Sequence, residues 1–244
     1  MKTSHLAAMI LAAQAMNTTA SASVVLPGGT LADLAIAGTT SIYHVFGHAG
    51  NPGGDSGSDT PAIRIDFNAG ANNVFSISAT GLVGCCSDSP NITPDGGNSS
   101  AHISGTNGLS GILGNAQIAL VGVFTSEIDP FGSVAPVSLS FDAANPISLS
   151  PLLAQVFYIG DGKSGKNNPS GTALTFTAPT NASRLYLGLT DGWAFNGLPG
   201  YYGDNRGAFT ANVSLAPVPL PAALPLMLTG LGALGLASRR KQEA

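Results

Sequence analysis

The stretch RLYLGLTDGWAFNGLPGYYGDNRGAFTANVS, residues 184–214, decides the fold of this chain. It begins with apolar residues at every second position from Leu185 to Leu189, and it ends with the same pattern from Phe209 to Val213. Apolar side chains at every second position are typical of a β-strand with one buried face. The residues between the two patterns are rich in Gly, Asp and Asn, which favour turns. The stretch therefore predicts a strand, a polar loop and a second strand.

The same pattern recurs along the chain, and clusters of Gly, Pro, Asn and Asp separate the segments. Two runs, 118–124 and 156–159, are apolar at all positions, which predicts central strands that are covered on both faces. The only helix expected before the C-terminal segment is short, at residues 151–155. We therefore expect an all-β fold, a jelly-roll-like antiparallel β-sandwich of about eight or nine strands. Further one-sided strands are predicted at residues 63–67, 75–79 and 174–178.

The charge of the chain is low and acidic. Nine Lys and Arg residues stand against thirteen Asp and Glu residues, which gives a net charge of −4. Four of the basic residues lie near the two ends, so the central part of the chain is more acidic still. Binding to nucleic acid requires clustered Lys and Arg. We therefore expect no nucleic-acid partner.

The N-terminal segment has the features of a signal peptide. Lys2 is followed by a short apolar stretch, residues 6–15, and then by Ala20, Ser21 and Ala22. Small residues in this A-x-A pattern are typical of the cleavage site of an exported protein. Residues 1–22 are therefore predicted to be removed.

The C-terminal segment, residues 218–244, has the features of a membrane anchor. Its uncharged apolar run is followed at once by Arg239, Arg240 and Lys241. A helix rises about 1.5 Å per residue, so roughly twenty residues cross a hydrocarbon core of about 30 Å. Basic residues after such a helix stay on the cytoplasmic side. The segment predicts one transmembrane helix, which leaves residues 23–217 as the exported domain.

The anchor begins with Val218, Pro219, Leu220, Pro221 and Ala222. This VPLPA box, the apolar run and the terminal basic cluster together resemble the PEP-CTERM sorting tails of the VPLPA variety. In Gram-negative bacteria such tails are recognised by a membrane-embedded exosortase. The resemblance implies an inner-membrane intermediate, cleavage near the box, and transfer of the domain to the cell surface or extracellular matrix.

Oxygen-bearing side chains stand at both ends of the loop within residues 184–214. Asp191 ends the first strand, and Asp204 and Asn205 precede the second. Calcium binds about six to eight oxygen atoms from carboxylates, amides and backbone carbonyls. The same residue types also form ordinary turns. The spacing therefore leaves two interpretations open, a calcium site and a plain turn.

Residues 157–213 resemble the C-terminal half of the PA-IL-like galactose-binding lectins, which are jelly-roll sandwiches with a calcium ion in the sugar site. The matching features include the strand that ends at Asp191 and the run PGYYGDNRG, residues 199–207. An earlier stretch, 74–97, resembles the strand and loop that supply one more carbonyl in that family. The calcium ligands that the resemblance implies are Asp191, the carbonyl of Tyr201, Asp204, Asn205 and a carbonyl near Gly84 or Cys85.

The same resemblance implies a sugar ligand, a galactose-like glycan or exopolysaccharide. Two sugar hydroxyls can complete the calcium shell while an aromatic ring packs on the pyranose. This chain has a longer loop after Asp191 than the family, and Trp193 within it could instead be a hydrophobic plug under the loop. The candidates for sugar contact are Trp193, Tyr201, Tyr202, His102 and Asn107.

Cys85 and Cys86 are the only cysteines, and they are adjacent. A vicinal disulfide, two partly buried thiols and an intermolecular link are all compatible with this pattern, whereas a CxxC redox motif or a zinc site is not.

No nucleophile elbow, HExxH or P-loop motif occurs. His44 lies in an expected strand, residues 41–47, which leads into a Gly-Pro loop that begins near His48, so their spacing of four does not make a metal pair. The chain is therefore not expected to be an enzyme, and an exported hydrolase finds no motif in support. Two functions remain: a calcium-dependent carbohydrate-binding surface protein, or a structural surface or biofilm-matrix protein of the same fold without a sugar site.

Overall fold

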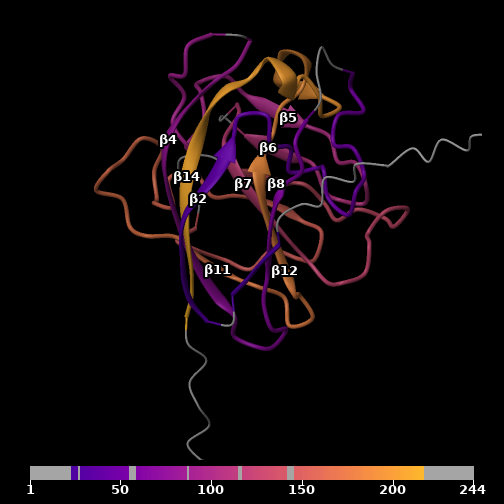
Figure 1. Ribbon diagram of the computed structural model, residues 1–244, viewed down its shortest axis with the longest axis vertical. Helices are drawn as coiled ribbons and strands as arrows, with labels where there is room; N and C mark the ends of the chain where they lie inside the picture. The colour runs from indigo at the N-terminus through magenta and orange to yellow at the C-terminus, as the bar shows by residue number, and fades with distance from the viewer. Residues whose placement is uncertain are drawn as a thin grey trace, which may run out of the picture.

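The computed structural model describes residues 23–26, 28–54, 59–86, 88–114, 117–141 and 146–216, which consist of strands, turns and loops (Figure 1). No α-helix occurs within these ranges, and the helical segments are two short 3-10 turns, η1 (Trp193–Phe195) and η2 (Tyr202–Asp204). No helix of the described part has the length and apolar character that a membrane crossing requires. The expectation of an all-β fold is confirmed, while the predicted signal peptide and sorting tail lie outside the described residues.

The described strands form three sheets. In hydrogen-bonded order, the central sheet contains β1 (Ser23–Val25), β3 (Ile63–Asp66), β12 (Arg184–Leu189), β7 (Leu120–Thr125) and β10 (Val156–Tyr158). In the same order, the second sheet contains β2 (Gly29–Ala37), β14 (Arg206–Leu215), β4 (Val74–Gly84), β11 (Thr175–Thr177) and β9 (Ser148–Leu149). The third sheet likewise contains β13 (Asn196–Gly197), β5 (Ala101–Ile103), β6 (Ile112–Gly114) and β8 (Leu139–Phe141).

The sheets are mixed, so the expectation of a purely antiparallel arrangement is wrong. The long pairs are antiparallel, as β14 is with β2 and β4, and as β12 is with β3 and β7. Four pairs are parallel: β1 with β3, β9 with β11, β13 with β5, and β6 with β8. Each of these pairs involves a strand of only two or three residues. Such strands are too short to show an alternating pattern, which is also why the structure has more strands than expected.

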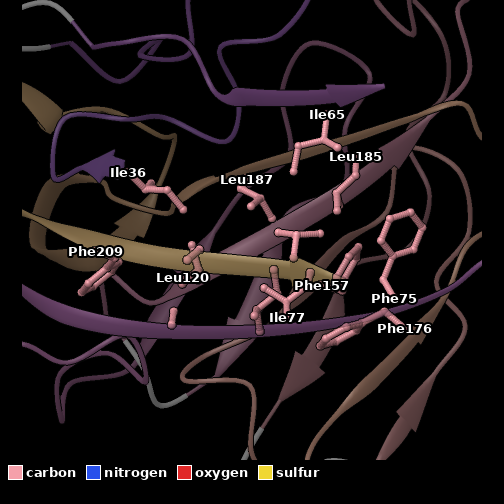
Figure 2. Close-up of a cluster of buried hydrophobic side chains, with 14 of the residues drawn as sticks. Ile36, Ile65, Phe75, Ile77, Leu120, Phe157, Phe176, Leu185, Leu187 and Phe209 are labelled. Atoms are coloured by element: carbon pink, nitrogen blue, oxygen red, sulfur yellow. The ribbon is translucent and has the colours of Figure 1, made fainter. Parts of the chain in front are cut away.

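The central sheet is buried on both faces. On β7, Leu120 and Phe124 pack in the core between the central and second sheets, while Val121 and Val123 pack in a core on the opposite face with the third sheet. Figure 2 shows the first of these cores, where side chains of β3 and β12 face those of β14 and β4. The prediction of two covered faces is therefore confirmed for both apolar runs. The prediction that residues 156–159 form a central strand is wrong, because β10 lies at the edge of its sheet.

The short helix expected at residues 151–155 does not form. Ala154 has a φ of 61°, in the left-handed region that a right-handed helix cannot contain. The side chain of Gln155 accepts the backbone N–H of Leu152 at 2.9 Å, which closes a single turn instead.

Three strand ends that come from distant parts of the sequence meet at one end of the molecule. β12 ends at Leu189, β14 begins at Arg206, and Gly84 at the end of β4 pairs with Arg206. This end is uppermost in Figure 1, and the loop of residues 190–205 lies there. The fold therefore brings the loop singled out by the sequence next to the end of β4.

Candidate functional site

Asp191 and Asn205, which begin and end this loop, are in direct contact. The Asn205 Nδ2 group donates to Asp191 Oδ2 at 2.9 Å and to the carbonyl of Gly38 at 3.0 Å. Asp191 Oδ1 accepts the backbone N–H of Gly192 at 2.7 Å. Both residues are buried, and each is only 2% exposed. The structure therefore brings together two of the predicted calcium ligands and fixes them in place.

The other amide atom of Asn205, Oδ1, is buried and has no hydrogen-bond partner among the described residues. Leaving a buried acceptor unsatisfied costs about 1–3 kcal/mol, so native structures rarely do so without a reason. An amide oxygen is also one of the ligand types that calcium binds. The Asn205 Oδ1 atom is therefore available as a ligand for a cation.

Asp204 lies next to Asn205 at the end of η2, and it is partly exposed. Its carboxylate accepts no hydrogen bond and forms no ion pair within the described part of the chain. Arg206 forms no ion pair with it, and its guanidinium donates instead to the carbonyls of Gly203 and Asn205. A carboxylate that is next in sequence to Asn205, the contact of Asp191, and that has no ion-pair partner in the described part of the chain is also consistent with a cation site.

Cys85 belongs to the same region. Burial raises the pKa of its thiol to about 12, with further contributions from a hydrogen bond to Cys86 and from the negative charges of Asp191 and Asp204. The Cys85 carbonyl accepts the N–H of Asp88 at 2.8 Å, and a carbonyl has a second lone pair that remains for a cation. The Cys85 thiol therefore lies within electrostatic reach of both carboxylates, and its carbonyl stays a predicted calcium ligand.

Tyr202 does not lie where a sugar contact requires it. Its side chain is fully buried, and its hydroxyl accepts the N–H of Asp191 at 3.1 Å and donates to the carbonyl of Leu189 at 3.3 Å. Burial raises the pKa of the hydroxyl well above its usual value. Tyr202 thus fixes the backbone at Asp191 from the buried side of the loop. The prediction that it contacts a sugar is wrong, because its side chain is not exposed.

The exposed aromatic surface of the loop is formed by Trp193 and Tyr201. Their ring centroids are 5.1 Å apart, and Trp193 is 69% exposed. The alternative that Trp193 is a buried hydrophobic residue under the loop is therefore wrong, because its side chain is largely exposed. Tyr201 has a left-handed φ of 66°, and Ala194 and Phe195 also have positive φ values, so the backbone turns sharply on both sides of the pair. These two rings are the aromatic groups that a ligand at this end can reach.

His102 and Asn107 are placed differently from each other. His102 on β5 is exposed and pairs with Asn196 of β13, within the same long loop as Trp193. The Nδ2 group of Asn107 is used by the backbone, because it donates to the carbonyls of Tyr43 and Ala49 at 3.0 and 2.9 Å. His102 therefore remains a candidate for ligand contact, while Asn107 has a structural role.

Gly38 also belongs to the site, although no sequence pattern pointed to it. Its carbonyl orients the Asn205 amide, and a Cβ atom at this position would lie 3.2 Å from the Cβ of Asn205. The contact depends on how β2 pairs with β14, which the sequence does not reveal.

No group of three or more His, Cys, Asp or Glu residues arranged to hold a metal occurs in the described part of the chain. Any cation at this end would thus rely on carbonyl and amide oxygens besides the two carboxylates.

A polar groove of about 330 Å³ lies beside β4 and is lined in part by Thr93, Asp95, Asp161 and Lys163. The buried Asp95 carboxylate accepts the Tyr158 hydroxyl at 3.0 Å and the N–H groups of Asp161 and Asn167 at 2.8 and 2.7 Å. Because its oxygens already hold the following loop in place, Asp95 is structural.

The chain is similar to no family model, no curated protein and no solved structure.

Proposed function

We propose that this protein is an exported, calcium-dependent carbohydrate-binding protein, with its ligand site at the end of the molecule formed by Asp191, Asp204 and Asn205. The observation that carries the proposal is the buried Asn205 Oδ1, an acceptor with no hydrogen-bond partner among the described residues, in the side chain that contacts Asp191. The negative charges of Asp191 and Asp204 both act on Cys85, so the two carboxylates lie in one region, and carboxylates in one region repel each other unless a cation compensates them. A calcium ion bound between them accounts for all three groups at once.

The calcium ion would be held by Asp191, Asp204, Asn205 and backbone carbonyls near Tyr201 and Cys85. Calcium accepts such a mixed set of oxygens in flexible geometry, whereas magnesium demands a tighter octahedron and gives up its waters reluctantly. The site would therefore prefer calcium to magnesium.

The sugar part of the proposal rests on the exposed pair Trp193 and Tyr201. Two neighbouring hydroxyls of a galactose-like residue replace calcium-bound waters, and one ring packs on the apolar face of the pyranose. His102 lies beside the same loop and is available to donate to a sugar oxygen. Oxygen-to-calcium contacts and stacking together need no proton transfer, which agrees with a non-enzymatic role.

The wider assignment rests on the sequence. A jelly-roll-like sandwich, made by the central and second sheets, is the fold that we propose for the domain. Removal of residues 1–22 and recognition of the VPLPA tail by an exosortase would deliver the domain to the surface or extracellular matrix of a Gram-negative bacterium. The alternative is a structural matrix protein with this fold and no ligand.

The test is a thermal melt of the protein without residues 217–244, first in chelator and then in millimolar calcium. We expect calcium to add about 2.7 kcal/mol to the free energy of unfolding when the free ion is a hundredfold above its dissociation constant, because it binds the folded state only. Magnesium should add much less.

Asp204→Asn keeps the shape of the side chain and removes its charge, so it should abolish most of the calcium effect while leaving the melt in chelator nearly unchanged. The matched control is Glu127→Gln, an exposed carboxylate near the opposite end of β12, where Arg184 donates to its backbone carbonyl. If the wild type melts at the same temperature with and without calcium, the structural alternative stands.

A further inference from the structure

The two adjacent cysteines are held in direct contact at the end of β4. Cys86 Sγ donates to Cys85 Sγ at a distance of 2.8 Å, and both are thiols in this structure. Cys85 is partly buried against the core, whereas Cys86 is exposed. One sulfur is thus accessible to a reagent in solution, and the other lies immediately behind it.

The backbone holds this arrangement. Cys86 has a left-handed φ of 59°, and the bond from the Asp88 N–H to the Cys85 carbonyl closes the turn that contains both residues. The turn follows Gly84, which is paired with Arg206 of β14. Because the start of the turn is fixed to the sheet, the fold itself holds the two sulfurs in contact.

We propose that Cys85 and Cys86 are a redox site and form a reversible vicinal disulfide. The Cys86 thiolate attacks one sulfur of an external disulfide, such as oxidised glutathione, and one glutathione thiolate leaves. The Cys85 sulfur, after giving its proton to solvent, then attacks the Cys86 sulfur and displaces the second glutathione thiolate. The two thiols lose two protons and two electrons in total, and the external disulfide is reduced to two thiols.

The bond is a redox site and not a permanent cross-link. Neighbouring Cα atoms are about 3.8 Å apart across a trans peptide, below the range of about 4.4–6.8 Å that most disulfides span. Such a bond is strained, and strained disulfides are more easily reduced. The pair should therefore open in a reducing buffer that leaves ordinary structural disulfides intact.

The experiment uses the full chain in detergent, equilibrated with excess oxidised or excess reduced glutathione. After quenching in acid, free thiols are trapped with a maleimide and the intact mass is measured. Because the chain has only two cysteines, a monomer that has lost two hydrogen atoms and carries no adduct contains the vicinal bond. We expect this species in oxidised glutathione, and a doubly maleimide-labelled monomer in reduced glutathione.

Two single variants separate the steps. Cys85→Ser should stop at a glutathione adduct on Cys86, because the second sulfur is missing, and Cys86→Ser should react much more slowly because Cys85 is less accessible. A stable glutathione adduct on the wild type, a disulfide-linked dimer, or two free thiols in excess oxidised glutathione would each overturn the proposal. No arm of the experiment contains calcium or sugar, so its outcome is independent of the proposed ligand site.

Discussion

Two neighbouring tyrosines in the long loop have opposite surroundings. The hydroxyl of Tyr202 is fully buried between the Asp191 N–H and the Leu189 carbonyl, whereas Tyr201 is partly exposed and packs against Trp193. Removing a buried hydroxyl costs stability mainly when it takes a hydrogen bond away from a buried group. The pair therefore offers a matched comparison of structural and surface roles.

Tyr202→Phe should lower the free energy of unfolding by about 1–3 kcal/mol, because it removes the hydroxyl that accepts the buried N–H of Asp191, while the Leu189 carbonyl keeps its bond from the N–H of Ile42. Tyr201→Phe should change it by no more than about 0.5 kcal/mol, as is usual for a surface substitution. Urea unfolding in the absence of calcium measures both. Equal effects of the two substitutions would contradict the assignment of Tyr202 as a support for the loop.

Trp193 allows the ligand proposal to be tested without disturbing the fold. Its side chain is largely exposed, so Trp193→Ala should leave both the melting temperature and its calcium dependence nearly unchanged. If the ring packs on a sugar, retention of the protein on immobilised galactose in calcium should fall sharply. Retention that is equal for Trp193→Ala and wild type would remove Trp193 from the proposed sugar site.

At the scale of elements, β7 and β4 bury their side chains in different ways. All six residues of β7 are buried, and the strand contributes to two separate cores. On β4, buried Phe75, Ile77 and Ala79 alternate with exposed residues over the first part of the strand. One strand therefore separates two hydrophobic layers, while the other closes one layer toward solvent.

Substitutions on the two strands should follow this difference. Leu120→Ala should cost about 2–5 kcal/mol on one face of β7, and Val121→Ala on the other face should also destabilise. On β4, Ile77→Ala should cost a similar amount to Leu120→Ala, whereas Ser78→Ala should change stability by no more than about 0.5 kcal/mol. Chemical unfolding of the four variants checks this, and a neutral Val121→Ala would mean that the third sheet does not cover β7.

These same elements show what the sequence could and could not predict. The apolar run at residues 118–124 predicted a strand covered on both faces because burial on both faces leaves no place for polar residues. The parallel strand β13 could not be predicted, since two residues carry no periodicity and its pairing with β5 depends on the tertiary fold. The contact of Asn205 with Gly38 was hidden for the same reason.

Within the site, the sequence predicted the region better than the roles. Asp191, Asn205 and Cys85 do gather at one end, because their strand ends do. The doublet Tyr201-Tyr202 gave no signal of which ring is buried, as a sharp loop has no fixed period. Likewise, the polar character of Asn107 suggested a ligand contact, but its amide satisfies two backbone carbonyls.

At the scale of the whole molecule, the last described strand is paired on both sides and contributes to the core. β14 (Arg206–Leu215) lies between β2 and β4 in the second sheet, and its side chains Phe209, Ala211 and Val213 are buried in the core. The final described residue, Ala216, donates its N–H to the carbonyl of Val74. The VPLPA box begins two residues later.

Cleavage near this box should therefore leave the described fold intact. We expect the chain without residues 217–244 to unfold cooperatively in urea, whereas a chain that ends at residue 205 should not fold, because the second sheet loses the strand that joins β2 to β4. In a host with a matching exosortase, mass spectrometry of surface protein should find peptides up to β14 but none from residues 226–241. Surface protein that retains those residues would count against sorting, and a failure of the protein without residues 217–244 to fold would mean that the domain boundary lies further along the chain.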